Sequence, residues 1–277
     1  LQDSAVLQSL KSLGYRLISV ESLYEGVHLA NADQIVSESA ENLGISYFEK
    51  TLIGFTPVGK ILERLAVHDA TYTQVRFALA KHDYSKFRPP FFVYNHVVAP
   101  LPPFNIAADG QSRPSAFAMG DGSHRLEVEP AWYESYRSGY VEKLRYTNKA
   151  VLEKVRYLLA NVPDPKIIVL HSDHGGGLLL DKDNKPRTCL KERMSAFLAV
   201  YSSNDVPASE IPDRLNLVNL YRILLRDSFG ADLPPLPARS YFAPWDEPYS
   251  FEPVSKAELE TFGPTCARPY GAIAARR

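Results

Sequence analysis

The sequence predicts an α/β protein with a mostly parallel sheet and helices on both faces of that sheet. The alternation of two kinds of stretch leads to this prediction. Short apolar stretches rich in β-branched and aromatic residues alternate along the chain with longer stretches whose apolar residues recur every three or four positions. We find no internal repeat and no evident linker, so we expect one domain over residues 1–277.

The chain opens with a helix pattern that is followed by a strand pattern. Residues 4–13 carry leucine and valine at helical spacing, and Gly14 is a natural helix stop. Tyr15–Ser22 is short and contains β-branched residues, which predicts a strand with no strand before the helix. Residues 32–80 show a mostly helical pattern that glycines and a proline interrupt. Phe91–Val98 predicts a strand that is apolar enough to be buried on both faces.

The second half of the chain continues this alternation. Tyr140–Leu159 predicts the clearest helix, with valine and leucine on one face and lysine and glutamate on the opposite face. Strands are predicted at Ile167–Leu170 and Ala196–Tyr201. Leu215–Phe229 predicts a helix that ends at Gly230.

Two stretches predict irregular structure. Asn105–Glu129 contains three glycines and follows a proline-rich turn, so we expect a long surface loop there. Residues 231–277 are rich in proline and aromatic side chains, and we expect this tail to wrap around the surface. Both stretches are places where substrate choice would be determined, because binding residues concentrate in loops.

Composition and charge exclude some classes of function. The 277 residues carry 31 lysines and arginines against 32 acidic residues, and this balance argues against a general nucleic-acid binder. No stretch reaches the roughly 20 consecutive apolar residues that a membrane-spanning helix needs. Cys189 and Cys266 are compatible with a disulfide in an oxidising compartment and with separate thiols in the cytosol; we favour separate thiols. No sequence pattern indicates an oligomeric state.

The stretch KIIVLHSDHGGG, residues 166–177, predicts a site. Asp173 and His174 follow a buried strand, and ligands of open parallel sheets bind beyond the carboxyl ends of the strands. An aspartate oxygen and a histidine nitrogen are good ligands for Zn²⁺ or Mn²⁺, and the glycines would let the backbone approach an anion. A metal there would act on an anionic ester as a Lewis acid and would activate an oxygen nucleophile. The alternative is that Asp173 caps a helix and that His174 only makes a hydrogen bond. We interpret His171 as a structural residue rather than a ligand, because side chains alternate along a strand and His171 points away from the residue that follows it.

The same stretch resembles the Asp-His-Gly segment of the alkaline phosphatase superfamily, in the branch of sulfatases and lipoteichoic-acid-synthase-like phosphotransferases. Further segments resemble that branch in the same order: Ser9–Ser22, Pro89–Phe104, Tyr140–Leu159 and Asn219–Ala243. The resemblance implies one divalent metal ion (Mn, Zn or Ca) on Asp173 and His174. It also implies hydrolysis or transfer of a small anionic ester, or of a phosphate or sulfate linked to a lipid or glycan. The site would lie on the extracytoplasmic face of a bacterial membrane.

The sequence departs from this family pattern at the nucleophile. The family takes an acidic ligand from a first strand and a Thr, Ser or Cys nucleophile soon after it, whereas this chain opens with a helix. We interpret Ser4 as a helix cap and Ser22 as a polar residue at a strand end. The chain as given is therefore expected to be inactive by itself.

Other departures concern substrate and metal binding. Leu101 stands where related proteins place a histidine, whereas His96 stays a candidate for substrate contact together with Gly175 and Arg193. Two-metal members of the family take a further histidine well downstream of Asp-His-Gly, whereas all seven histidines of this chain lie at or before His174, so the resemblance implies a single metal ion. Two other interpretations stay open: a non-catalytic binding relative of the family, or an unrelated α/β binding protein with a coincidental Asp-His-Gly segment.

Overall fold

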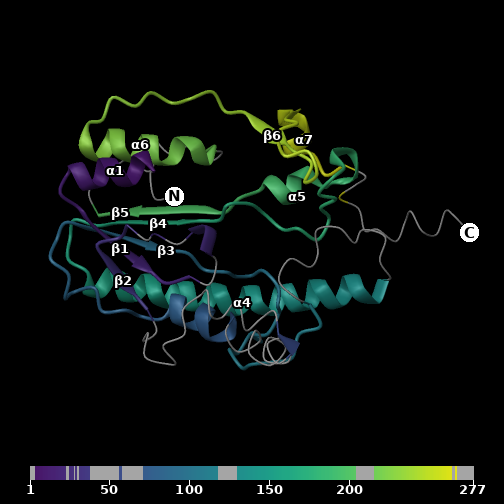
Figure 1. The fold of residues 1–277 in the computed structure, drawn as a ribbon, viewed down its shortest axis with the longest axis horizontal. Coiled ribbons are helices and arrows are strands. Elements are labelled where there is room, and N and C mark those ends of the chain that lie inside the picture. The colour runs from purple at the N-terminus through teal and green to yellow at the C-terminus, as the bar shows by residue number, and fades with distance from the viewer. Residues whose placement is uncertain are drawn as a thin grey trace, which may run out of the picture. The chain divides into compact units, whose positions relative to one another are not determined.

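The protein is described by a computed structural model that contains both helices and strands, among them a small parallel sheet (Figure 1). The described residues are 4–22, 25–27, 29, 31–37, 56–57, 71–117, 130–203, 215–263 and 266. Two compact units make up the chain: Leu1–Met119 with Ser138–Val162, and Gly120–Arg137 with Pro163–Arg277. The α/β class is confirmed at this level, and the single domain stays a prediction.

A three-stranded parallel sheet forms the centre of the first unit. Its strand order is β2 (Gln34–Val36), β1 (Arg16–Val20), β3 (Phe91–Asn95), and helix α1 (Ala5–Ser12) precedes β1. The last four residues of β1 are buried, as suits a central strand. The strand β3 is half-buried along its whole length, so the prediction that both of its faces are buried is wrong. Its residues are more exposed than those of β1 because β3 is paired on one side only in the described sheet.

Helices cover the two faces of this sheet (Figure 1). Leu7 and Leu10 of α1 are buried, and residues 138–161 of the long helix α4 (Pro130–Asn161) lie on the other side. Ile18 of β1 packs there with Leu158. The helix α4 begins at Pro130 rather than at the predicted Tyr140, and proline is favoured at a first helical position. Ser4 precedes α1 as the predicted cap residue, although its side chain makes no capping hydrogen bond.

The stretch predicted as mostly helical is only partly described. Residues 71–79 are helical, as expected. Gln34–Val36 forms the strand β2 instead, because pairing with β1 outweighs the local helical pattern. The histidines at 28 and 68, and the second half of the predicted loop after residue 117, lie outside the described residues.

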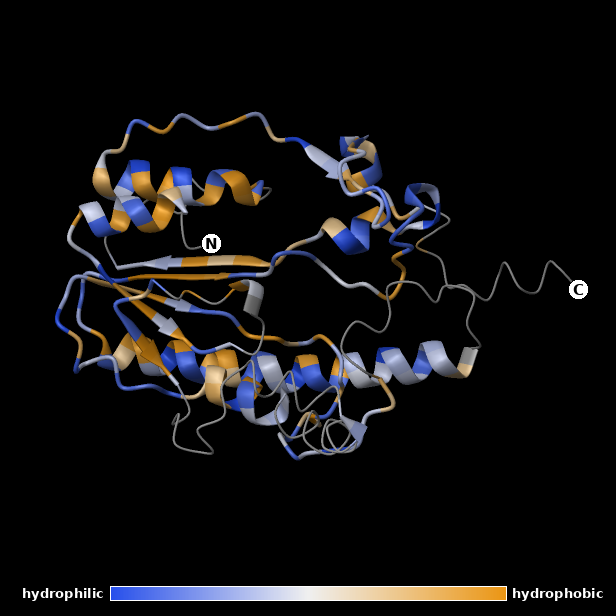
Figure 2. Cartoon of the chain, in the orientation of Figure 1, coloured by the Kyte–Doolittle hydropathy of each residue, from blue (hydrophilic) through white to orange (hydrophobic). Residues whose placement is uncertain are grey.

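In the second unit, β4 (Ile167–His171) pairs with β5 (Leu198–Ser202), which confirms both predicted strands. This pair is antiparallel and so departs from the parallel arrangement that we expected. The helix α6 (Leu217–Phe229) has one hydrophobic and one hydrophilic face (Figure 2). It ends at Gly230, whose φ of 66° lies in the left-handed region, as the sequence predicts.

The C-terminal part of the second unit contains short elements. The hairpin β6 (Ser240–Phe242) and β7 (Glu252–Val254) is antiparallel, and α7 (Lys256–Glu260) follows it. Phe242 and Val254 share a small core with Leu180 and with Leu190 of α5 (Leu190–Met194). The remaining elements are two 3-10 turns, η1 (Glu25–Val27) and η2 (Lys185–Arg187).

A disulfide closes the second unit. Cys189, which immediately precedes α5, is bonded to Cys266. Our expectation of two separate thiols is therefore wrong. The hairpin and α7 bring residue 266 back to α5, and sequence spacing alone does not reveal this proximity. Among the described helices, none is long and apolar enough to cross a membrane.

Candidate functional site

The predicted site residues Asp173 and His174 lie in the loop directly after β4. Ser172 ends the strand with two hydrogen bonds to Phe197: its N–H donates to the Phe197 carbonyl (3.0 Å), and its hydroxyl accepts from the Phe197 N–H (2.8 Å). The side chain of Asp173 is 83% exposed, whereas that of His174 is 30% exposed. The end of the β4–β5 ladder therefore presents these two side chains at the surface of the second unit.

The two side chains face one another. Asp173 Oδ1 accepts a hydrogen bond from the backbone N–H of His174 (3.0 Å), and Asp173 Oδ2 lies 3.5 Å from His174 Nε2. Two ligands of a tetrahedral ion with bonds of about 2.1 Å stand about 3.4 Å apart. Asp173 Oδ2 and His174 Nε2 thus have the spacing of two ligands of one metal ion.

The other ring nitrogen of His174 has two neighbours. His174 Nδ1 lies 2.8 Å from the Gly175 carbonyl oxygen and 2.8 Å from Arg193 Nη1. With the proton on Nδ1, this N–H would donate a hydrogen bond to the carbonyl oxygen and Nε2 would be free to bind a metal, the usual arrangement for metal-bound histidine. A hydrogen bond from Arg193 requires the opposite tautomer, with the proton on Nε2 beside Asp173. The Arg193 hydrogen bond and a metal ion on Nε2 therefore require opposite tautomers of His174, so each excludes the other.

Arg193 and Gly175 both lie beside His174 Nδ1, and they also contact each other. The N–H of Gly175 donates to the carbonyl of Arg193 (2.8 Å), so this amide is engaged within the protein rather than directed at a ligand. Burial lowers the pKa of Arg193, while the negative charge of Asp173 opposes that shift. The structure thus brings four of the five predicted site residues together in the second unit.

Close packing explains the first two glycines of the loop. A side chain at position 175 would overlap the backbone carbonyl of Glu192, and one at position 176 would overlap the Glu192 carboxylate. That carboxylate accepts hydrogen bonds from the N–H groups of Leu178 and Leu179, and burial raises its pKa. Sequence reasoning missed Glu192; its only signal was an acidic residue in a short stretch of arginine and lysine.

The fifth predicted residue, His96, belongs to the first unit. It follows β3, and its Nδ1 lies 2.9 Å from the hydroxyl oxygen of Ser22, which follows β1. Sequence reasoning treated these two residues separately. Leu101, in the turn after His96, is 44% exposed, and the ammonium of Lys143 donates to the carbonyl oxygen of the same residue (2.7 Å).

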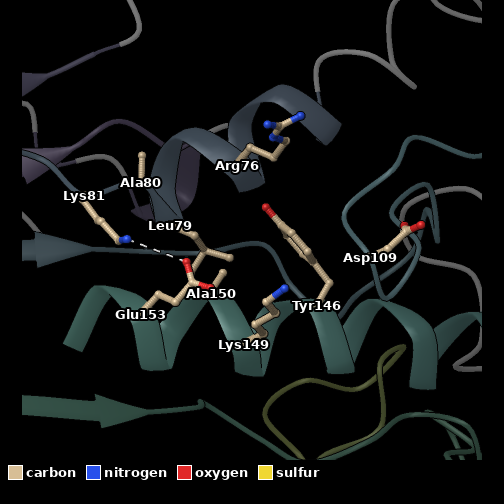
Figure 3. Close-up of a pocket in the computed structure, with 9 residues that line it drawn as sticks. All are labelled: Arg76, Leu79, Ala80, Lys81, Asp109, Tyr146, Lys149, Ala150 and Glu153. Carbon is tan, nitrogen blue, oxygen red and sulfur yellow. Dashed lines mark ion pairs between the residues drawn. The ribbon is translucent and has the colours of Figure 1, made fainter. Parts of the chain in front are cut away.

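A pocket of about 340 Å³ opens elsewhere in the first unit, between residues 71–81 and α4 (Figure 3). Its side chains are mainly charged; Lys81 and Glu153 form an ion pair of 3.8 Å across one end, and Tyr146 and Lys149 point into the pocket (Figure 3). None of the five predicted residues lines it.

Within the described residues, no group of three or more His, Cys, Asp or Glu side chains is arranged to hold a metal, so Asp173 and His174 form a two-residue set there.

Comparison of the chain with protein-family models, with curated proteins and with solved structures found no match in any of the three.

Proposed function

We propose that this chain is an alkaline-phosphatase-like α/β protein of the sulfatase-like branch, and that it acts in metal-dependent hydrolysis or transfer of phosphate or sulfate esters. The observation that carries the proposal is the 3.5 Å spacing of Asp173 Oδ2 and His174 Nε2 at the end of a strand. The ordered set of family-like segments supports it, and the hydrogen-bonding distance from His174 Nδ1 to the Gly175 carbonyl supports it further.

Each side chain of the site has a role in this proposal. Asp173 and His174 would hold one divalent ion (Mn, Zn or Ca), which would supply Lewis-acid chemistry when bound. The carbonyl oxygen of Gly175 would keep the imidazole in the metal-binding tautomer by accepting a hydrogen bond from Nδ1–H. Arg193 would turn its guanidinium from His174 to the oxygens of the anionic ester, since a planar guanidinium matches phosphate and sulfate oxygens.

The proposed substrate is a small anionic ester, or a phosphate or sulfate carried by a lipid or glycan, and not a nucleic acid. The near-neutral charge of the chain supports the exclusion of nucleic acid. We also propose an extracytoplasmic location at a bacterial membrane. The Cys189–Cys266 disulfide supports that location, because such bonds persist in oxidising compartments.

Metal uptake is the first test of this proposal. The chain is dialysed separately against Mn²⁺, Zn²⁺ and Ca²⁺, and the bound metal is measured by mass spectrometry. We expect one ion per chain for at least one metal. D173N and H174Q should weaken its binding by at least about ten-fold, because D173N removes the negative charge of the carboxylate ligand and H174Q removes the imidazole nitrogen.

The matched control is H171Q, since His171 lies in the same strand-to-loop stretch and contacts the ring of Tyr221. Its metal uptake should equal that of the unchanged chain. The metal-loaded chain should also bind inorganic phosphate or sulfate, and R193Q should weaken that binding. Equal metal uptake by D173N, H174Q and the unchanged chain would contradict the proposal.

A further inference from the structure

The first unit brings a serine and a histidine together at the ends of two neighbouring parallel strands. Ser22 Oγ and His96 Nδ1 are 2.9 Å apart. In the β1–β3 register Val20 lies opposite Asn95, so Ser22 and His96 come just beyond the carboxyl ends of the two strands. This edge is where open parallel sheets bind their ligands.

The backbone that carries each residue is anchored to the helical residues 71–79. Gln74 Nε2 donates to the carbonyl of Glu21, next to Ser22 (3.2 Å). Asn95 Nδ2, next to His96, donates to the carbonyl of Ala78 (2.8 Å). One helix therefore holds both strand ends in place, and a fixed geometry is what a nucleophile and its base require.

The same two amide side chains carry buried oxygens without a hydrogen-bond donor among the described residues. These atoms are Gln74 Oε1 and Asn95 Oδ1, and Gln74 is only 7% exposed. A buried acceptor without a partner is unfavourable, because no hydrogen bond offsets its loss of hydration. These two unsatisfied acceptors lie on the side chains that hold the two strand ends, and they are an observation independent of the serine–histidine contact.

We propose that Ser22 and His96 are the nucleophile and general base of a metal-independent acyl-transfer site for carboxylic esters. A serine hydroxyl within hydrogen-bond reach of a histidine is the arrangement of an activated nucleophile. The pair itself brings no positive charge, so it suits a neutral ester carbonyl better than a phosphate, whose transfer relies on cations. This site is separate from the metal function proposed for Asp173 and His174.

The reaction balances with water as the co-reactant. The step requires a neutral imidazole with its proton on Nε2, so that Nδ1 accepts the Ser22 proton while Oγ bonds to the ester carbonyl carbon. The carbon–oxygen bond to the leaving alcohol breaks, and the alcohol takes the proton from His96. Water then attacks the acyl-serine, gives its proton to Nδ1, and releases the carboxylic acid as Ser22 regains its proton.

The test uses the full chain in EDTA with a fluorophosphonate probe, which reacts with activated serines. We expect the probe on the peptide that contains Ser22, a burst of p-nitrophenol from p-nitrophenyl acetate, and loss of both in S22A. H96N keeps a polar group beside Ser22 but cannot take up a proton. It should slow labelling roughly 100-fold and should abolish the rise of the labelling rate with pH that histidine deprotonation causes.

The matched control is S85A, because the exposed Ser85 hydroxyl donates to a carboxylate rather than to a histidine. It should label like the unchanged chain, and circular dichroism checks that every variant is folded. Labelling that survives S22A, that is equally fast in H96N, or that EDTA abolishes would overturn the inference. Labelling is measured without metal and metal uptake without ester, so either proposal fails independently of the other.

Discussion

Two lysines of α4 depart most from the chemistry expected of their residue type. Lys143 is fully buried, and its ammonium donates to the carbonyls of Leu101 (2.7 Å) and Pro103 (3.1 Å). Lys154 is 9% exposed, and its ammonium donates to the carbonyl of Ala78 (2.7 Å). Burial lowers the pKa of each lysine from 10.5 to about 8.

These lowered pKa values predict that the free energy of unfolding rises with pH between about 8 and 10. In this range the unfolded chain binds more protons than the folded chain, because its lysines still titrate near pH 10.5. The contribution is on the order of 3 kcal/mol per lysine at most. Above about pH 11 the trend should reverse, because the lysines are then mostly neutral in both states while burial raises the pKa of Tyr84 to about 12 and keeps its proton on the folded chain. Urea unfolding at pH 7.5, 8.5, 9.5, 10.5 and 11.5 measures both trends.

Single-residue variants separate this effect from general pH sensitivity. K154M should flatten the rise, because it removes one of the two titrating groups. K149M changes an exposed lysine of the same helix and should keep the rise. A free energy of unfolding that is constant from pH 7.5 to 9.5 in the unchanged chain would contradict the prediction.

At the residue scale, sequence reasoning identified residues that the structure brings together in the candidate site, and it missed what surrounds them. Asp173, His174 and Arg193 were recognisable from residue type and position after a strand, and they do lie together. The burial of Lys143 was not predictable, because its acceptors are backbone carbonyls of a distant turn and leave no trace in side-chain chemistry. The contact of Ser22 with His96 was hidden for a similar reason, since it depends on the pairing of β1 with β3.

At the element scale, the loop after β4 and the helix α5 form one packed structure. The N–H of Gly175 reaches the carbonyl of Arg193, and the N–H of Cys189 donates to the carbonyl of Leu179 (2.9 Å). The carboxylate of Glu192 accepts from two further loop amides. The helix α5 therefore holds the loop that carries Asp173 and His174, so the geometry of the site depends on close contact between loop and helix.

This contact predicts that G175A is strongly destabilising. A methyl group at position 175 would overlap the carbonyl oxygens of Glu192 and Ser195, which are backbone atoms that cannot rotate away. We expect the free energy of unfolding to fall by about 2–3 kcal/mol, the range of overpacked sites. Thermal or urea unfolding measures the change.

The neighbouring G177A is the matched control. A methyl group there would lie 3.7 Å from Arg193 Nη1, an ordinary contact with a flexible side chain. Its free energy of unfolding should stay within about 0.5 kcal/mol of the unchanged chain. Equal effects of G175A and G177A would show that the loop does not pack on α5 as described.

Elements were predictable where periodicity was strong. The helices α1 and α6, the end of α6 at Gly230, and the strands β1, β4 and β5 follow from apolar spacing and helix-stop residues. Pairing was not predictable. The strand β2 is held by a parallel ladder against its local pattern, and the antiparallel direction of β4 and β5 is set by their tertiary contact.

At the scale of the whole molecule, the second unit is closed by a link that sequence spacing did not reveal. Cys189 and Cys266 are 77 residues apart, so no local pattern marks them as partners. Residues around each cysteine also meet without the bond: the ammonium of Lys191 donates to the carbonyl of Glu260 (2.9 Å) and lies over the ring of Phe262 (3.9 Å). The disulfide therefore joins segments that already pack together.

The loop length predicts how much the disulfide stabilises the second unit. Closing a loop of this length lowers the entropy of the unfolded chain by an amount worth about 4.5 kcal/mol at most. Reduction with dithiothreitol should therefore lower the free energy of unfolding by about 2–4 kcal/mol. The double variant C189A/C266A should show the lower stability from the start and should not respond to reductant. Alanine suits position 189, because Cys189 is 1% exposed and a methyl group leaves no unpaired polar atom there. Two thiols that react freely with Ellman's reagent in the unreduced native chain would contradict the pairing.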